Sequence, residues 1–179
     1  MDSLPLPDPP LADDEVELVP YTEADADLIV EYCNDQQIAH YTFLPVPYRR
    51  RHALDFIANQ DRRRERGEAI DLAIRDRADR ALLGAVGLRA FREDRRSVEV
   101  GYWIAPPARG RDAAARAVRL ITPWALANLP LARVDIPLDF HNHGSRRVAE
   151  KAGFRLTSER RRLHAKGREW LMDVYAFGP

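Results

Sequence analysis

The stretch with the clearest chemical potential is RGRDAA, residues 109–114, which follows a proline pair and precedes a long run of helical apolar spacing. Backbone amides at the start of a helix have no intrahelical partner and carry partial positive charge, so such a turn can hold an anion. Arg109 and Arg111 add charge that could reach phosphate oxygens. Asp112 adds a carboxylate to the same turn. Because aspartate is among the best N-caps, we expect its side chain to cap the helix.

A second group of candidates lies in FHNHGSRRVAEKAGF, residues 140–154. Asn142 and Ser145 stand there between the end of a predicted strand and the start of a predicted helix. A serine at this position is a natural N-cap, so capping explains Ser145 as well as a chemical role does. Tyr175, beside Asp173 on the last predicted strand, is a further candidate hydroxyl.

Glu99 lies inside SVEVGYWIA, residues 97–105, which reads as a strand. If Val98 and Val100 face one side of the sheet, Glu99 faces the other. A carboxylate in a central strand is unfavourable unless it is paired or faces a wet cleft. We therefore expect Glu99 either to have an ionic partner or to face a cleft, and we take it as a candidate functional residue.

The elements that would position these groups can be read from the periodicity of the sequence. Apolar alternation predicts strands near 15–21, 69–76, 81–91, 97–105, 132–139, 155–164 and 168–177. Helical spacing predicts a helix that starts at Thr22 and further helices over 49–66, 113–126 and 145–154. The order β-α-α-β-β-β-α-β-α-β-β indicates an α/β domain around a central mixed, mostly antiparallel sheet of about seven strands flanked by about four helices.

The length suits one domain, because 179 residues, of which 45% are apolar, can form a sizeable core. Residues 1–14 are rich in proline and acids and show no periodicity, so we expect a flexible or loosely docked tail. The domain itself is predicted to span 15–179.

Composition also excludes several classes of function. The 28 basic and 28 acidic residues balance, so no net charge favours a nucleic-acid or membrane partner. Cys33 is the only cysteine, which excludes an internal disulfide, and no cysteine and histidine spacing suits zinc. No segment approaches the roughly 20 apolar residues of a membrane helix, and no signal peptide is evident. We expect a cytoplasmic protein without a metal.

The segment EVGYWIAPPARGRDAAARAVRLITPWAL, followed by HNHGSRRVAEKAGF, resembles the GNAT superfamily of acyl-CoA-dependent N-acyltransferases. The resemblance covers roughly residues 15–178 and points to the branch of the ribosomal-protein-alanine acetyltransferases. It implies a GNAT-like fold in which amides of the 109–114 turn hold the pyrophosphate of coenzyme A and the strand at 102–104 pairs with the pantetheine arm. The implied coenzyme-binding residues are Tyr102, Trp103, Ile104, Arg109, Gly110, Arg111, Asp112, Ala113, Ala114, Asn142 and Ser145.

The activity that the resemblance implies is transfer of an acetyl group from acetyl-CoA to a primary amine by direct attack in a ternary complex. The acceptor would be a protein N-terminus or a small molecule, Glu99 would be the base, and Ser145 or Tyr175 would protonate the leaving thiolate. The alternatives are a structural or substrate-orienting carboxylate for Glu99, helix capping for Ser145, and edge or core packing for Tyr175. The alternative is an acyl-CoA-binding or scaffold protein that keeps the GNAT fold and has weakened or lost catalysis. The sequence leaves monomer and homodimer both open.

Two positions depart from the family pattern. Asp112 stands where the family signature has glycine, and Thr157 stands where relatives often carry a glutamate. The first departure leads us to expect weaker coenzyme A binding, because a second negative charge faces the pyrophosphate. The second removes one alternative base and makes the expected chemistry depend on Glu99.

Overall fold

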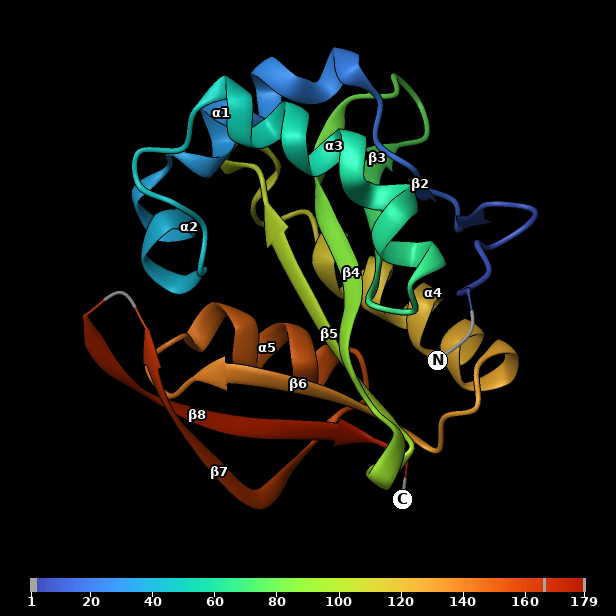
Figure 1. Ribbon diagram of the computed structural model, residues 1–179, viewed down its shortest axis with the longest axis vertical. Helices are drawn as coiled ribbons and strands as arrows, with labels where there is room; N and C mark the ends of the chain where they lie inside the picture. The colour runs from blue at the N-terminus through green and yellow to red at the C-terminus, as the bar shows by residue number, and fades with distance from the viewer. Residues whose placement is uncertain (1–2, 166, 179) are drawn as a thin grey trace.

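The computed structural model describes residues 3–165 and 167–178, which form one eight-stranded sheet with helices on both faces (Figure 1). The strands are β1 (Leu11–Ala12), β2 (Val16–Val19), β3 (Ala69–Asp76), β4 (Leu82–Arg92), β5 (Ser97–Ile104), β6 (Arg133–Asp139), β7 (Arg155–Ala165) and β8 (Arg168–Phe177). The α-helices are α1 (Ala26–Cys33), α2 (Gln36–Tyr41), α3 (Arg50–Glu65), α4 (Ala113–Asn128) and α5 (His143–Lys151). Short 3₁₀ turns lie at Glu23–Asp25, Glu93–Arg95 and Pro106–Ala108.

The sheet has the strand order β1-β2-β3-β4-β5-β6-β8-β7, and its pairs are antiparallel except for β5 and β6. The parallel pair is joined by the crossover through α4, as a parallel connection requires. Its pairing covers only Ser97–Glu99 against Arg133–Asp135. Beyond that point the two strands diverge (Figure 1), and this divergence shapes the site described below.

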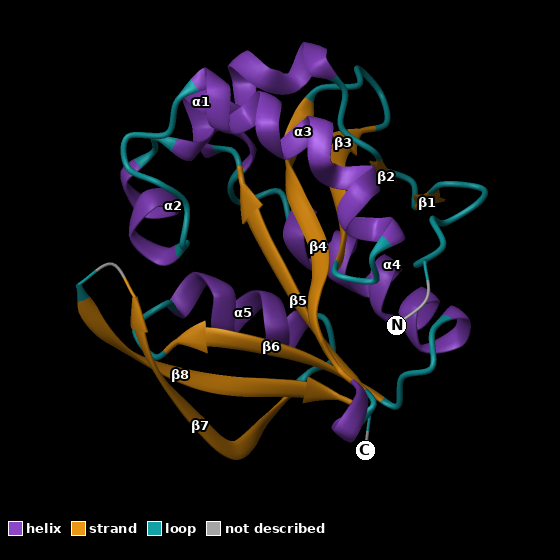
Figure 2. Ribbon diagram, in the orientation of Figure 1, coloured by secondary structure: helices purple, strands orange, loops and turns teal. Residues whose placement is uncertain are grey.

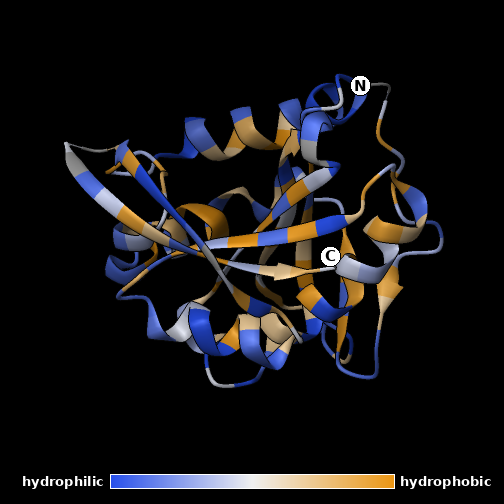
Figure 3. Cartoon of the chain, turned by 90° about the horizontal axis from the view of Figure 1, so that it is seen from below, coloured by the Kyte–Doolittle hydropathy of each residue, from blue (hydrophilic) through white to orange (hydrophobic). Residues whose placement is uncertain are grey.

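Helices cover both faces of the sheet (Figure 2). Helix α4 packs Val118 and Ile121 into the main core with sheet residues such as Leu88. Helices α1 and α3 form a second core on the opposite face, which contains Ile29 and Ile57. Each of these helices therefore needs one apolar side, and Figure 3 shows hydrophobic and hydrophilic residues mixed within single helices and strands. Among the described residues, no helix combines the length and the apolar character needed to cross a membrane.

The predicted α/β class and the mixed, mostly antiparallel sheet are confirmed. The strands at 69–76 and 168–177 begin and end at the predicted residues. Two elements were not predicted, namely the two-residue strand β1 and the helix α2. Helix α2 escapes sequence patterns because it has six residues and buries only Ile38, too few for a helical period to appear.

The segment ahead of residue 15 lies against the domain in the structure. Leu4 is buried in the main core, and its backbone N–H and C=O bond to the carbonyl oxygen and guanidinium of Arg64 at 3.0 and 2.8 Å. Strand β1 pairs with β2, and Arg116 of α4 forms ion pairs with Asp13 and Asp14. The boundary at residue 15 therefore does not separate packed from unpacked residues, and the flexibility of this segment stays a prediction.

Candidate functional site

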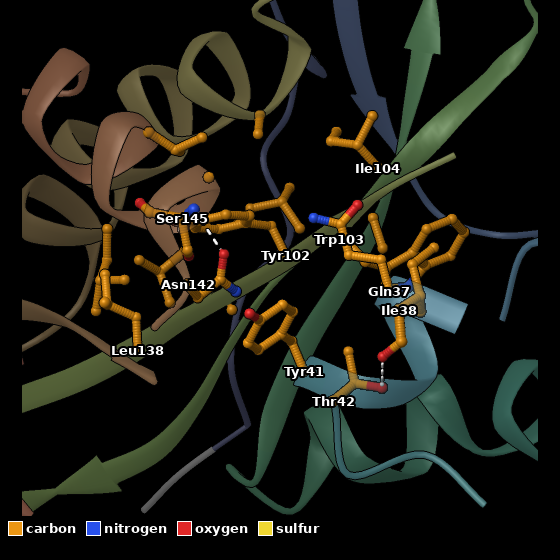
Figure 4. A pocket seen from close by; sticks show the side chains of 18 of the residues that line it. Gln37, Ile38, Tyr41, Thr42, Tyr102, Trp103, Ile104, Leu138, Asn142 and Ser145 are labelled. Atoms are coloured by element: carbon orange, nitrogen blue, oxygen red, sulfur yellow. Dashed lines mark hydrogen bonds between the residues drawn. The ribbon is translucent and has the colours of Figure 1, made fainter. Parts of the chain in front are cut away.

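A cavity of about 670 Å³ opens where β5 and β6 diverge. One of its walls is β5 from Glu99 to Ile104, and another is the segment from Ile38 to Leu44, which contains the end of α2. Residues of the turn before α4 and of the start of α5 also line the cavity. Figure 4 shows side chains from α2, β5 and α5 converging on this space.

The second half of β5 presents a free backbone edge to the cavity. The strand pairs with β4 up to Ile104, but it pairs with β6 only up to Glu99. An exposed strand edge offers N–H and C=O groups to an extended partner that carries amides. Tyr102, Trp103 and Ile104, which the resemblance assigned to this role, all line the cavity (Figure 4).

The turn before α4 has the shape of an anion site. Gly110 and Asp112 have positive φ angles of 81° and 57°, and a Cβ at Gly110 would meet nothing within 4 Å. The turn is therefore open towards its surroundings. Gly110, Asp112, Ala113 and Ala114 line the cavity, so the unpaired amides at the start of α4 lie beside it.

Asp112 does not cap α4, which corrects our expectation. It occupies the N-cap position, but its left-handed backbone, with φ 57° and ψ 11°, differs from the extended conformation that directs an N-cap side chain to the helix amides. Both carboxylate oxygens instead accept hydrogen bonds from Lys151 Nζ of α5, at 2.6 and 2.8 Å. This hydrogen bond holds the pKa of Asp112 below its ordinary value, so the carboxyl stays ionised.

Both arginines of the turn are engaged by carboxylates. Arg109 lines the cavity and pairs with Asp35, the N-cap of α2. Arg111 pairs with Asp76 of β3 and does not belong to the cavity lining. The Arg109 hydrogen bond holds the pKa of Asp35 below its usual range. The anion-binding capacity of the turn therefore rests first on its backbone amides.

Ser145 is not the N-cap of α5, which also corrects our expectation. The helix starts earlier, at His143, because Asn142 Oδ1 accepts the backbone N–H of Ser145 at 3.0 Å (Figure 4). The Ser145 hydroxyl is left free for another partner and lies 2.7 Å from the Tyr102 hydroxyl. Burial raises the pKa of Tyr102 although the Ser145 hydrogen bond opposes the shift, so this phenol keeps its proton at neutral pH. All three residues line the cavity.

Glu99 lines the cavity where β5 and β6 begin to separate. Its carboxylate accepts a hydrogen bond from the Arg161 guanidinium of β7. Arg161 also contacts Glu159 at 2.9 Å and Asp135 at 3.4 Å. The side chain thus has both features that a carboxylate in a central strand needs, an ionic partner and a wet cleft.

Tyr175 is not brought to this cavity. The side chain is buried in the main core, and its hydroxyl is 3.5 Å from Glu150 Oε1 of α5. Among the predicted catalytic residues, Glu99 and Ser145 line the cavity and Tyr175 does not. The reason is the strand alternation of β8, because Tyr175 faces the helix that covers this part of the sheet.

A charged group that sequence reasoning missed lines the cavity beyond Glu99. Asp71 of β3 is 8% exposed, and the Arg63 guanidinium of α3 donates to it. Arg89 of β4 lies 3.8 Å from the same carboxylate. The sequence signal for Asp71 is the same as for Glu99, a carboxylate inside an apolar strand. Its partners Arg63 and Arg89 come from other elements, so only the folded structure shows that they meet it.

Comparisons with known proteins show the family to which the chain is related. The family described as acetyltransferase (GNAT) domain matches residues 15–155. The chain is 36% identical over 76 residues, 42% of each chain, to YdaF of Bacillus subtilis (strain 168), which is named provisionally as a ribosomal N-acetyltransferase. The matched stretches span about half the length of the curated relatives.

Solved structures share the fold over most of the chain. Ribosomal-protein-S5-alanine acetyltransferase from Vibrio fischeri superposes with a TM-score of 0.80 at 16% identity and covers 94% of this chain and 96% of its own. RimJ of Mycobacterium smegmatis in complex with CoA-disulfide has a TM-score of 0.80 at 19% identity and covers 91% of this chain and 81% of its own. These likenesses establish the fold of the described residues.

Proposed function

Because the chain belongs to the acetyltransferase (GNAT) domain family, we propose that it transfers an acetyl group from acetyl-CoA to a primary amine in a ternary complex. The observation that carries the proposal is one continuous cavity, which joins the anion turn before α4 to Glu99 along the open edge of β5. A coenzyme A thioester requires a site for its phosphates, which the anion turn can provide. An amine acceptor requires a base, which Glu99 can provide.

The residues of the cavity fit acetyl-CoA, which supplies an acetyl thioester when bound. Amides from Gly110 to Ala114 would hold the pyrophosphate, as helix N-termini do. The free edge of β5 at Tyr102–Ile104 would bond to the amides of the pantetheine arm. The relation to RimJ, whose structure holds a coenzyme A disulfide, supports this assignment.

Each chemical step can be given to a residue of this cavity. Glu99 accepts the proton of the attacking amine, directly or through water, as the nitrogen–carbon bond forms and the carbon–sulfur bond breaks. Arg161 keeps Asp135 and Glu159 as partners when Glu99 becomes neutral, so its charge stays compensated. A backbone N–H of β5 stabilises the developing charge on the acyl oxygen.

The leaving sulfur needs a proton, and we assign its delivery to the Ser145 and Tyr102 hydroxyl pair. These hydroxyls are hydrogen-bonded and line the cavity, whereas Tyr175 lies in the core. For the acceptor we propose a protein N-terminus, because relatives in sequence and in fold are named as acetyltransferases of ribosomal proteins. Such a substrate would place the reaction in the cytoplasm.

The test of this function is Glu99→Gln. We expect turnover of acetyl-CoA with amine acceptors to fall about a hundredfold or more and the pH optimum to rise, because the neutral amide cannot accept a proton. Acetyl-CoA should still raise the melting temperature of the variant as it does for the wild type, since a ligand of the native state stabilises it. Thiol release and thermal shift are the two measurements.

Glu169→Gln is the matched control, because this glutamate pairs with Arg162 on the surface of the β7/β8 hairpin, away from the cavity. Unchanged turnover in Glu99→Gln would remove Glu99 as the base. A wild-type melting temperature that acetyl-CoA does not shift would refute the transferase function and leave the scaffold reading.

A further inference from the structure

We propose that the amine acceptor carries a carboxylate close to its reactive amine and that Arg89 binds this carboxylate. The inference rests on the proposed transferase function and adds the substrate class. It starts from a geometric fact: Arg89 of β4 is the direct cross-strand partner of Glu99 of β5. Directly opposed residues on antiparallel strands point to the same face, with Cβ atoms about 5 Å apart. Both side chains line the cavity.

Arg89 is held in the cavity without a close ionic partner. Within residues 3–165 and 167–178, Arg89 pairs with Asp71 over a distance of 3.8 Å between Nη2 and Oδ1. Its side chain is 56% exposed. The guanidinium lies over Gly101, where a Cβ would come within 3.4 Å of Arg89 Cζ. The absence of a side chain at Gly101 therefore leaves a space that the guanidinium occupies, beside the carboxylate assigned as base.

The charged side chains around this position form two clusters. Arg63 and Arg89 share the carboxylate of Asp71, so among the described residues this cluster carries a surplus positive charge. On the other side, the carboxylates of Glu99, Asp135 and Glu159 lie around Arg133 and Arg161. An ammonium group fits beside the second cluster and a carboxylate beside the first.

Tyr21 adds a hydrogen-bond donor to the positive cluster. It lines the cavity and is 4% exposed, and its hydroxyl has no hydrogen-bond partner among the described residues. Burial, and then the charge of Asp71, raises its pKa well above the ordinary value, so the hydroxyl keeps its proton. Buried hydroxyls are normally bonded, and a bound carboxylate would supply the missing acceptor.

Two acceptors share this chemistry. One is a free amino acid, whose carboxylate is its own α-carboxyl group. The other is a peptide N-terminus with an aspartate or glutamate at its first or second position. A plain alkylamine would leave Arg89 and Tyr21 without an anionic partner, so the site favours a zwitterionic acceptor over a neutral or cationic one.

The experiment compares kcat/KM for thiol release with acetyl-CoA and matched acceptors. The peptide arm uses C-terminally amidated tetrapeptides with aspartate or asparagine at position one or two, and the amino-acid arm uses alanine and alaninamide. In at least one of the two arms, we expect the wild-type kcat/KM to be at least about tenfold higher for the acceptor with the carboxylate than for its matched amide. This ratio corresponds to about 1.4 kcal/mol. Arg89→Gln should bring this ratio near one, and Arg89→Lys should restore part of it.

Arg50→Gln is the control, because Arg50 pairs with Asp27 on the surface and lies outside the cavity lining. A wild-type ratio of one in both arms would overturn the inference, as would a ratio that survives in Arg89→Gln. If Arg89 only supported Glu99, the substitution would slow both members of each pair equally and the ratio would survive. Absence of thiol release with every acceptor would instead refute the transferase function itself.

Discussion

Asp112 stands where the family signature has glycine, and its backbone is left-handed with φ 57°, a conformation that glycine adopts readily. Aspartate tolerates this conformation better than most residues because its short polar side chain bonds locally. What the residue changes is charge. It neutralises Lys151, which lines the same cavity and would otherwise be a cation available to a phosphate.

We predict that Asp112→Asn tightens acetyl-CoA binding about two- to fivefold. Asparagine also tolerates positive φ, so the turn should persist while Lys151 is released and one negative charge is lost. The expected size follows from exposed ion pairs being worth about 1 kcal/mol or less. Calorimetric titration at low and high salt would measure it, with the gain shrinking at high salt.

Asp14→Asn is the control for Asp112→Asn, because it also removes an exposed carboxylate but one that pairs with Arg116. Weaker binding in Asp112→Asn would mean that the aspartate holds Lys151 or the turn in place for the coenzyme. That outcome would assign the residue a supporting role in the site.

The sequence could predict residues whose role follows from local pattern. Strand alternation was enough to select Glu99, and the strand–turn–helix pattern was enough to select the turn at 109–114. It could not predict the direction of the Asp112 side chain, because this direction depends on the positive φ angle that Asp112 adopts in the folded chain. Nor could it find Arg89, whose significance comes from its register against Glu99 and from the space over Gly101.

Among the elements, the segment ahead of β2 is the one whose structure differs most from the expectation that its composition gave. Proline and acidic residues suggested a flexible or loosely docked tail, but composition does not reveal that a single leucine is buried in the core. Leu4 is 2% exposed and belongs to the main core. The strand β1 could not be predicted from the sequence either, because two residues cannot show alternation.

We predict that Leu4→Ala lowers the free energy of unfolding by about 2 to 4 kcal/mol, because truncating a buried leucine removes apolar contacts and leaves a cavity. Urea unfolding would measure this loss. Leu28→Ala, at a leucine that is 38% exposed, is the control and should have a smaller effect. An unchanged unfolding free energy in Leu4→Ala would show that the segment is undocked in solution.

At the scale of the whole molecule, burial of weak acids should make stability depend on alkaline pH. Burial raises the pKa of Cys33 from its ordinary 9.0 to about 12. Burial also raises the pKa of Tyr48 from 10.0 to about 12, with Cys33 and Asp55 adding to the shift. The second core contains both residues. Between these ordinary and raised values the unfolded chain loses protons that the folded chain retains, so the free energy of unfolding must fall as pH rises.

We predict a loss of at least about 3 kcal/mol in the free energy of unfolding between about pH 8 and about pH 10.5, since each pKa unit is worth about 1.4 kcal/mol. About 2 kcal/mol comes from Cys33 and about 1 kcal/mol from Tyr48, and the raised pKa values of Tyr21 and Tyr102 add to the loss. Lysine titration contributes little, because Lys151 and Lys166 are the only lysines among 28 basic residues and arginine stays charged. Urea midpoints across this range measure the slope. Cys33→Ala should flatten it and Tyr48→Phe should flatten it further at its upper end, whereas an equally steep slope in both variants would place the titrating groups elsewhere.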